Sequence, residues 1–214
     1  MSTPRLLVAY ASHDGQTRRI AEAIAAGFET WQVTYCDLRR EPLPALQAHD
    51  RVLVALGIRY GHFPPQAVAR LRVRINELRT HPDVALIGVC LSARKPRYAD
   101  PQRSAYLQRL LRRLVWQPGR LAMFAGALRY PRYRWWEQRL MQLVMLVSGG
   151  PTNRRTDTEY TDWRTVRRFG LEWAHSPILP ATGTDGCEGD NETTRVRGDH
   201  ALMIPGEAEW EARR

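Results

Sequence analysis

Lysine and cysteine are both scarce in this chain of 214 residues. Lys95 is the only lysine, so arginine carries nearly all of the positive charge. The cysteines, Cys36, Cys90 and Cys187, are odd in number and show no metal-ligand spacing, so we expect free thiols in a reducing cytoplasm and no metal site. No apolar stretch approaches the ~20 residues that span a bilayer, and no secretory signal pattern opens the chain. These absences argue against a disulfide-stabilised secreted protein and against a membrane-spanning one.

Acidic residues are in the minority, and they are unevenly placed. The formal net charge is +10, yet residues 176–214 hold eight acidic residues and only four arginines. The rest of the chain therefore carries a net charge of +14. A body this basic favours an anionic partner, which could be a nucleic acid, an anionic membrane surface or a polycarboxylate substrate.

A short polar loop follows the first apolar run, and it has neither the lysine of a Walker A loop nor the spaced glycines of a dinucleotide loop. The loop occupies residues 12–17 and leads directly into a helical pattern. The first amides of a helix lack intrahelical partners and attract anions. Gly15 permits close backbone approach, and Ser12 and Thr17 can donate hydroxyl hydrogen bonds. The loop resembles the FMN-phosphate loop of flavodoxins; the alternative is an ordinary N-cap turn.

Strand and helix patterns alternate along the chain. The expected strands cover 5–11, 31–37, 51–57, 84–91 and 121–128, and the expected helices cover 16–29, 64–79, 104–115, 135–147 and 161–174. Such alternation predicts a parallel sheet with helices on both faces. With a phosphate loop after the first strand, the prediction is an α/β flavodoxin-like domain over residues 1–175, and residues 176–214 read as a flexible tail.

The loops after the third and fourth strands should meet the first loop, because parallel strands end at one edge of the sheet. Tyr60 could stack on an isoalloxazine ring or simply cover the edge of the sheet, and Arg94 and Lys95 are also consistent with plain surface charges. The candidate flavin-binding residues are Ser12, His13, Asp14, Gly15, Gln16, Thr17, Ile58, Arg59, Tyr60, Gly61, His62, Leu91, Ser92, Ala93 and Arg94.

Aromatic residues and arginines interleave after the fifth strand, in the stretch 129–136. Single-stranded nucleic acid binding uses such mixtures. A porphyrin-like macrocycle would use them as well, since its flat face suits aromatic rings and its propionates suit arginine forks. The apolar helix expected at 135–147 is either a core helix or a lipid-facing one.

Several motifs together resemble one family. They are G-A-L-R-Y-P-R-Y-R-W, I-R-Y-G-H, A-R-K-P, S-G-G-P-T, Y-T-D-W and the S-x-D-G-Q-T loop. Over about residues 5–175 the chain resembles the flavodoxin-like, quinone-dependent protoporphyrinogen IX dehydrogenases of bacterial haem synthesis. The resemblance implies FMN, a menaquinone or ubiquinone acceptor, and peripheral association with the cytoplasmic face of the inner membrane. It also implies a long insertion around the fifth strand, which residues 92–120 could supply.

The resulting hypothesis is FMN-dependent oxidation of protoporphyrinogen IX to protoporphyrin IX, with no side chain assigned as an obligate base. Arg94, Lys95, Arg129, Tyr130 and Arg132 are the candidates for binding the substrate. The alternatives are an NAD(P)H:quinone reductase, a flavodoxin-type electron carrier and a nucleic-acid-binding module. For the preferred hypothesis we predict no nucleic-acid partner. A homo-oligomer is left open by the sequence.

Overall fold

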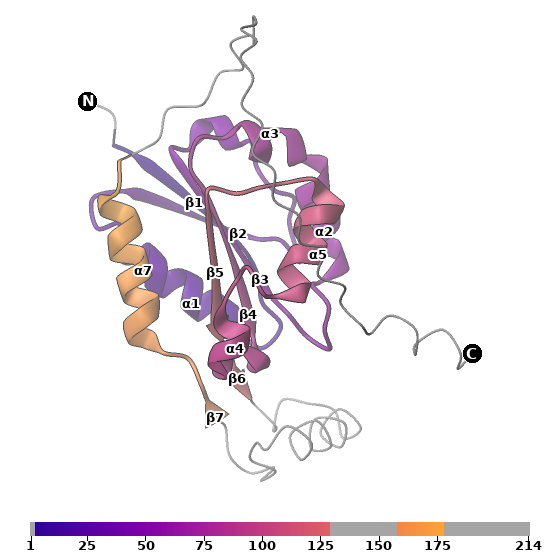
Figure 1. Cartoon of the computed structure of the whole chain (residues 1–214). Coiled ribbons are helices and arrows are strands. Elements are labelled where there is room, and N and C mark those ends of the chain that lie inside the picture. Colours follow the sequence, from indigo (N-terminus) through magenta and orange to yellow (C-terminus); the bar gives the residue numbers. More distant parts are fainter. Residues whose placement is uncertain (1–2, 129–157, 178–214) are drawn as a thin grey trace, which may run out of the picture. The chain divides into compact units, whose positions relative to one another are not determined.

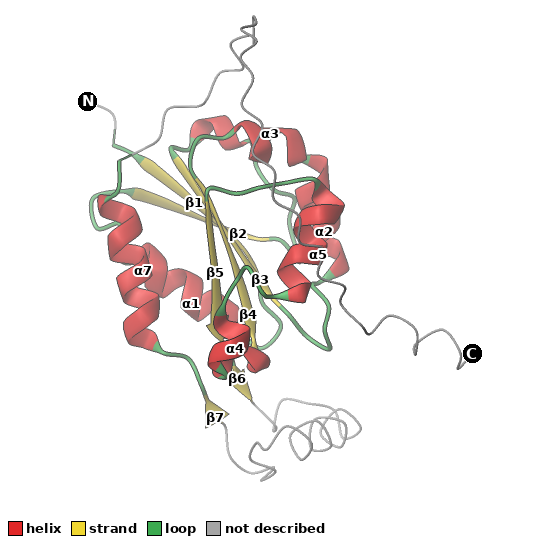
Figure 2. Ribbon diagram, viewed as in Figure 1, coloured by secondary structure: helices red, strands yellow, loops and turns green. Residues whose placement is uncertain are grey.

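The computed structural model describes residues 3–128 and 158–177, and their core is a five-stranded parallel sheet (Figures 1 and 2). The strand order is β2-β1-β3-β4-β5. All four neighbouring pairs are parallel; in the centre, Val8 pairs with Tyr35 on one side and with Leu53 on the other. The flavodoxin-like sheet predicted from the sequence is thereby confirmed.

The elements follow the alternation expected from the sequence. The strands of the main sheet are β1 (Arg5–Ala11), β2 (Gln32–Asp37), β3 (Arg51–Gly57), β4 (Val84–Cys90) and β5 (Arg120–Ala125). The α-helices are α1 (Gln16–Ala25), α2 (Pro65–Val73), α3 (Ile75–Thr80), α4 (Pro96–Ala99), α5 (Ala105–Leu114) and α7 (Trp163–His175). Two short 3-10 helices, η1 (Leu46–Ala48) and η2 (Leu91–Arg94), and a two-stranded ladder of β6 (Ala127–Leu128) with β7 (Thr158–Glu159) complete the described parts.

Two apolar cores cover the two faces of the sheet, because successive side chains of a strand point to opposite faces. Leu6, Val8 and Ile87 pack in the core that includes residues of α1 and α7. Leu7 and Leu86 pack in the other core, with residues of α2, α3 and α5. Figure 1 shows α1 and α7 on one side of the strands and α2, α3 and α5 on the other.

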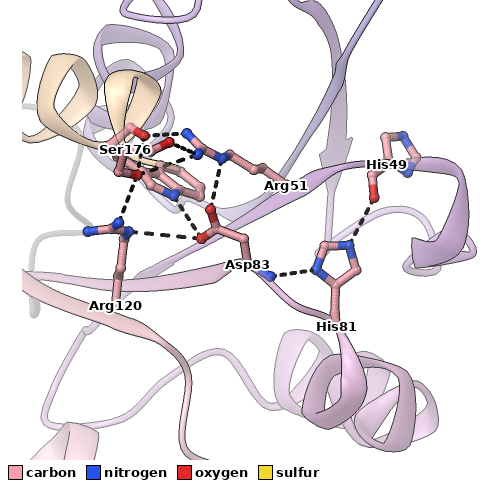
Figure 3. A network of polar contacts seen from close by, with 7 residues as sticks. His49, Arg51, His81, Asp83, Arg120 and Ser176 are labelled. Carbon is pink, nitrogen blue, oxygen red and sulfur yellow. Dashed lines mark hydrogen bonds and ion pairs between the residues drawn. The ribbon is translucent and has the colours of Figure 1, made fainter. Parts of the chain in front are cut away.

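A buried polar cluster ties α7 to the amino ends of three strands (Figure 3). Arg51 and Asp83 form an ion pair of 2.8 Å between side chains that are 1% and 5% exposed. Arg51 also donates to the carbonyls of Trp173 and Ser176, and the Trp173 indole donates to Asp83 at 2.9 Å. Arg120 adds a hydrogen bond of 2.8 Å to the Ser176 hydroxyl. The C-terminal end of α7 is therefore held by hydrogen bonds as well as by apolar packing.

The structure corrects several of the predicted boundaries. The first helix, predicted at 16–29, ends at Ala25. The helix predicted at 64–79 is two helices, because the backbone leaves helical geometry at Arg74, where φ is −107° and ψ is 20°. The strand predicted at 121–128 ends at Ala125 and resumes in β6, which pairs with β7 instead of β4. The segment after β4 starts with η2 and α4, which the sequence analysis did not predict. The helix predicted at 135–147 and the tail predicted at 176–214 fall largely or wholly outside the described residues, so the domain boundary at 175 stays a prediction.

Within residues 3–128 and 158–177, no helix has both the length and the apolar character needed to cross a membrane.

Candidate functional site

The loop after β1 places an open helix N-terminus at the carboxyl edge of the sheet. Gly15 precedes α1 with φ at 86°, a left-handed conformation that glycine adopts without strain. Gly15, as the N-cap residue, has no side chain to cap α1, and the first turn of the helix contains no acidic residue. Thr17 is almost fully buried in that turn. The free amides and the helix dipole favour an anion at this point.

Ser12 adds an unsatisfied donor to the same loop. Its hydroxyl oxygen is buried and, among the described residues, has no hydrogen-bond partner. A buried hydroxyl without a partner costs about 1–3 kcal/mol, so such a group is normally paired with the protein, with ordered water or with a bound ion or ligand. Ser12 therefore fits a ligand that brings hydrogen-bond acceptors, such as a phosphate.

A tight turn follows β3 and carries an exposed aromatic ring. Arg59 and His62 exchange two backbone hydrogen bonds of 2.9 and 3.0 Å. Tyr60 and Gly61 between them have φ values of 51° and 79°, the positive pair that a type I′ turn requires. Tyr60 is 43% exposed. The His62 imidazole is exposed and its Nδ1 lies 2.8 Å from the Tyr60 carbonyl oxygen, so His62 helps to hold the turn.

Charged side chains join this turn to the loop after β1. Asp14 contacts the His13 imidazole at 3.1 Å and the Arg59 guanidinium at 3.5 Å. Arg59 also hydrogen-bonds to His13 and lies 5.2 Å from the centre of the Tyr60 ring. Arg59, which follows β3, thus neutralises the Asp14 carboxylate and holds the two loops together.

The loop after β4 forms the 3-10 helix η2, and Arg94 at its end is not among the described residues that line the cavity. Ser92 lies 3.1 Å from the Cys90 thiol, measured between Oγ and Sγ, and Ala93 is buried. The Arg94 guanidinium lies 5.5 Å from the centre of the Tyr160 ring, on the segment that follows β7. Lys95 is exposed.

A cavity of about 700 Å³ opens between these loops. Ligand pockets for small molecules and cofactors typically enclose about 300–1,000 Å³. Of the predicted flavin-binding residues, ten line the cavity: His13, Asp14, Gln16, Ile58, Arg59, Tyr60, Gly61, His62, Leu91 and Ser92. Ser12, Gly15, Thr17, Ala93 and Arg94 are not among its described lining residues, nor is Lys95. Arg129, Tyr130 and Arg132 lie outside the described residues.

Sequence reasoning missed other lining residues, among them Arg39, Phe63, Cys90, Tyr106 and Gly126. Arg39 follows β2, which ends at the same edge as β1, so the rule that located the other loops also reaches this one. Tyr106 belongs to α5 and packs against the turn after β3: a Cβ placed on Gly61 would lie 3.3 Å from its ring. Nothing local in the sequence indicates that contact.

β7 and the residues after it are hydrogen-bonded to the first turn of α1. The Gln16 amide donates to Glu159 and to Thr161, each at 2.8 Å. Arg19 donates to Glu159 at 3.3 Å, and Thr161 donates to the Ala125 carbonyl at 2.8 Å. Burial alone would raise the pKa of Glu159, but the Gln16 hydrogen bond and the Arg19 charge outweigh it and lower that pKa. Glu159 and Thr161 are therefore fixed to Gln16, which lines the cavity.

The residues present fit a phosphorylated flavin. The uncapped α1 terminus, the Gly15 conformation and the unsatisfied Ser12 hydroxyl suit its phosphate. The exposed Tyr60 ring and the apolar Ile58 and Leu91 line the space beside it, as a flat ring system requires.

Comparison with known proteins gives three findings. The flavodoxin domain family matches residues 7–155. Protoporphyrinogen IX dehydrogenase [quinone] of Escherichia coli strain K12 is 37% identical over 178 residues, which cover 82% of this chain and 98% of that protein. The protein of the same name from Leishmania major is 33% identical over 179 residues, which cover 82% of this chain and 77% of that protein. Among solved structures, oxidised flavodoxin 1 from Bacillus cereus is 16% identical, with a TM-score of 0.49 over 81% of this chain and 99% of that one.

Proposed function

The chain belongs to the flavodoxin-domain family of quinone-dependent protoporphyrinogen IX dehydrogenases, and from this premise we propose that it oxidises protoporphyrinogen IX to protoporphyrin IX with FMN as cofactor and a membrane quinone of the menaquinone or ubiquinone type as electron acceptor. The observation that carries the substrate assignment is the match along 98% of the length of a relative with that name. The fold by itself would not identify a substrate, because flavodoxin-like sheets support many activities.

FMN would bind with its phosphate in the loop after β1. The amides at the start of α1 and the hydroxyls of Ser12 and Thr17 would donate to the phosphate oxygens. Residues 58–62 and 91–94 would flank the ring system, with Tyr60 offering its aromatic face. Bound FMN would supply the redox chemistry, taking two electrons at a time from the porphyrinogen and passing them to the quinone.

The protein itself would position the substrate and hold its charges. Arg94, Lys95, Arg129, Tyr130 and Arg132 are the candidates for its carboxylates, because guanidinium groups bind carboxylates through paired hydrogen bonds. Arg94 lies at the end of η2, over the Tyr160 ring. The turn after β3 is bound to the first loop through Arg59 and Asp14, and it would form the part of the cavity wall that contacts both substrate and flavin.

Peripheral contact with the cytoplasmic face of the inner membrane is part of the same proposal. Support comes from the basic body of the chain and from two exposed tyrosines that line the cavity, Tyr60 and Tyr106. Tyrosine rings suit the headgroup region of a bilayer, and each arginine or lysine near an anionic surface adds about 1 kcal/mol. Such contact would bring the cavity to a quinone dissolved in the bilayer.

The test is an anaerobic assay of the purified protein reconstituted with FMN, in which porphyrin fluorescence is followed after addition of protoporphyrinogen IX and a menaquinone analogue. We expect fluorescence to grow only when the quinone is present. Bound FMN with NAD(P)H-driven quinone reduction but no porphyrin would instead indicate a reductase. Sedimentation with phosphatidylglycerol vesicles, and not with phosphatidylcholine vesicles, is the result expected for membrane contact.

A further inference from the structure

Arg39 lies against the loop that precedes α1, although it comes from a different strand connection. It follows β2, and its guanidinium donates from Nη1 to the Ser12 carbonyl at 2.9 Å. It lines the cavity together with His13 and Asp14. A positive charge is thereby fixed within hydrogen-bond distance of the backbone that begins the loop.

In the described parts of the chain, the ion pairs around this loop include Arg59 but not Arg39. Asp14 places a carboxylate in the loop, and Arg59 pairs with it at 3.5 Å. Arg39 forms no ion pair with any carboxylate in the described parts of the chain, whereas its neighbour Arg40 pairs with Asp37 at 3.6 Å. Arg39 therefore supplies the positive charge that Arg59 does not, and a doubly charged phosphate beside Asp14 would need it.

We propose that Arg39 recognises the phosphate of the flavin, so that this protein selects FMN over riboflavin by charge as well as by backbone hydrogen bonds. The inference rests on the proposed FMN site and adds a residue to it. An interaction through partly exposed groups is screened by water and salt, so the expected contribution to affinity is modest.

The experiment compares two ligands that differ only in the phosphate. Apoprotein is titrated with FMN and with riboflavin, and binding is followed by quenching of flavin fluorescence. In Arg39→Ala we expect the Kd for FMN to rise about fivefold while the Kd for riboflavin stays within about twofold. Arg39→Lys should keep most of the FMN affinity because it keeps the charge, and the loss in Arg39→Ala should shrink in high salt.

Arg40→Ala is the matched control, because it removes a neighbouring exposed arginine that pairs with Asp37. We expect it to leave both affinities unchanged. Equal losses of FMN and riboflavin in Arg39→Ala would mean that Arg39 only shapes the loop and would overturn the inference, as would no loss of either. If the unaltered protein bound neither flavin, the proposed function itself would fail, a result distinguishable from the failure of Arg39 alone.

Discussion

The buried Ser12 hydroxyl should lower the stability of the apoprotein and raise its affinity for FMN. The hydroxyl has no partner within the described residues, and it lies in the loop where the phosphate is proposed to bind. In Ser12→Ala we expect the free energy of unfolding of the apoprotein to stay level or rise by about 1 kcal/mol, because an unsatisfied polar atom is removed. The same change should weaken FMN binding about threefold to tenfold, measured by fluorescence titration. If the free energy of unfolding and the FMN affinity both fell, the hydroxyl would instead have a structural role.

Val115 carries backbone strain that nothing at the cavity requires. It ends α5 with φ at 46°, a left-handed conformation that is costly for a β-branched residue, and the residue is 74% exposed. In Val115→Gly we expect the free energy of unfolding to rise by about 1 kcal/mol, measured by urea denaturation. Val115→Ala is the control, because it removes the exposed methyl groups but keeps a Cβ at positive φ, so it should recover much less. Equal gains in both variants would assign the effect to apolar exposure.

At the scale of elements, α1 and α7 pack so closely that there is no room for a side chain at Gly170. A Cβ added to Gly170 would lie 2.4 Å from the Ile24 carbonyl oxygen. Replacing glycine by alanine inside a helix normally stabilises it by about 1 kcal/mol, but in Gly170→Ala we expect a loss of about 1–3 kcal/mol because the two backbones must move apart. Thermal unfolding measures the change, and the exposed Arg167→Ala on the same helix is the control. A stabilised Gly170→Ala would contradict the packing described here.

The strands were more predictable than the segments between them, for a physical reason. β1, β3 and β4 are buried on both faces, so each is a continuous apolar run bounded by polar residues. At the break between α2 and α3, the Arg74 guanidinium donates to the carbonyl of Leu43, which is 31 residues away in sequence. The short helices η2 and α4 have only four residues each, fewer than a periodic pattern needs. Local periodicity carries no signal for these.

The candidate site was predictable to the extent that it depends on strand ends. The three loops at residues 12–17, 58–62 and 91–94 follow neighbouring strands, and side chains from all three line one cavity. Arg39 was missed although it follows β2 at the same edge of the sheet, and Tyr106 was missed because it reaches the site from α5. Glu159, far away in sequence, could be linked to Gln16 only by a structure.

At the scale of the whole molecule, the buried ion-pair cluster and the proposed cofactor site lie at opposite edges of the sheet. The cluster of Figure 3 lies at the amino ends of β3, β4 and β5, and the cavity lies at the carboxyl ends. Strands of six or seven residues separate the two by about 20 Å. Disturbing the cluster should therefore weaken the fold without altering the affinity for flavin.

Asp83→Asn tests this separation. It keeps the shape of the side chain but leaves Arg51 buried without its ion pair, so we expect the free energy of unfolding to fall by about 3–5 kcal/mol, measured by urea denaturation. Asp100→Asn is the control: it breaks a pair with Arg103 whose side chains are 41% and 77% exposed, and it should cost less than about 1 kcal/mol. Below the unfolding transition, the Kd of Asp83→Asn for FMN should stay within about twofold of the original value. A parallel loss of flavin affinity would show that the two edges are coupled through the sheet, because the substitution touches no residue of the cavity.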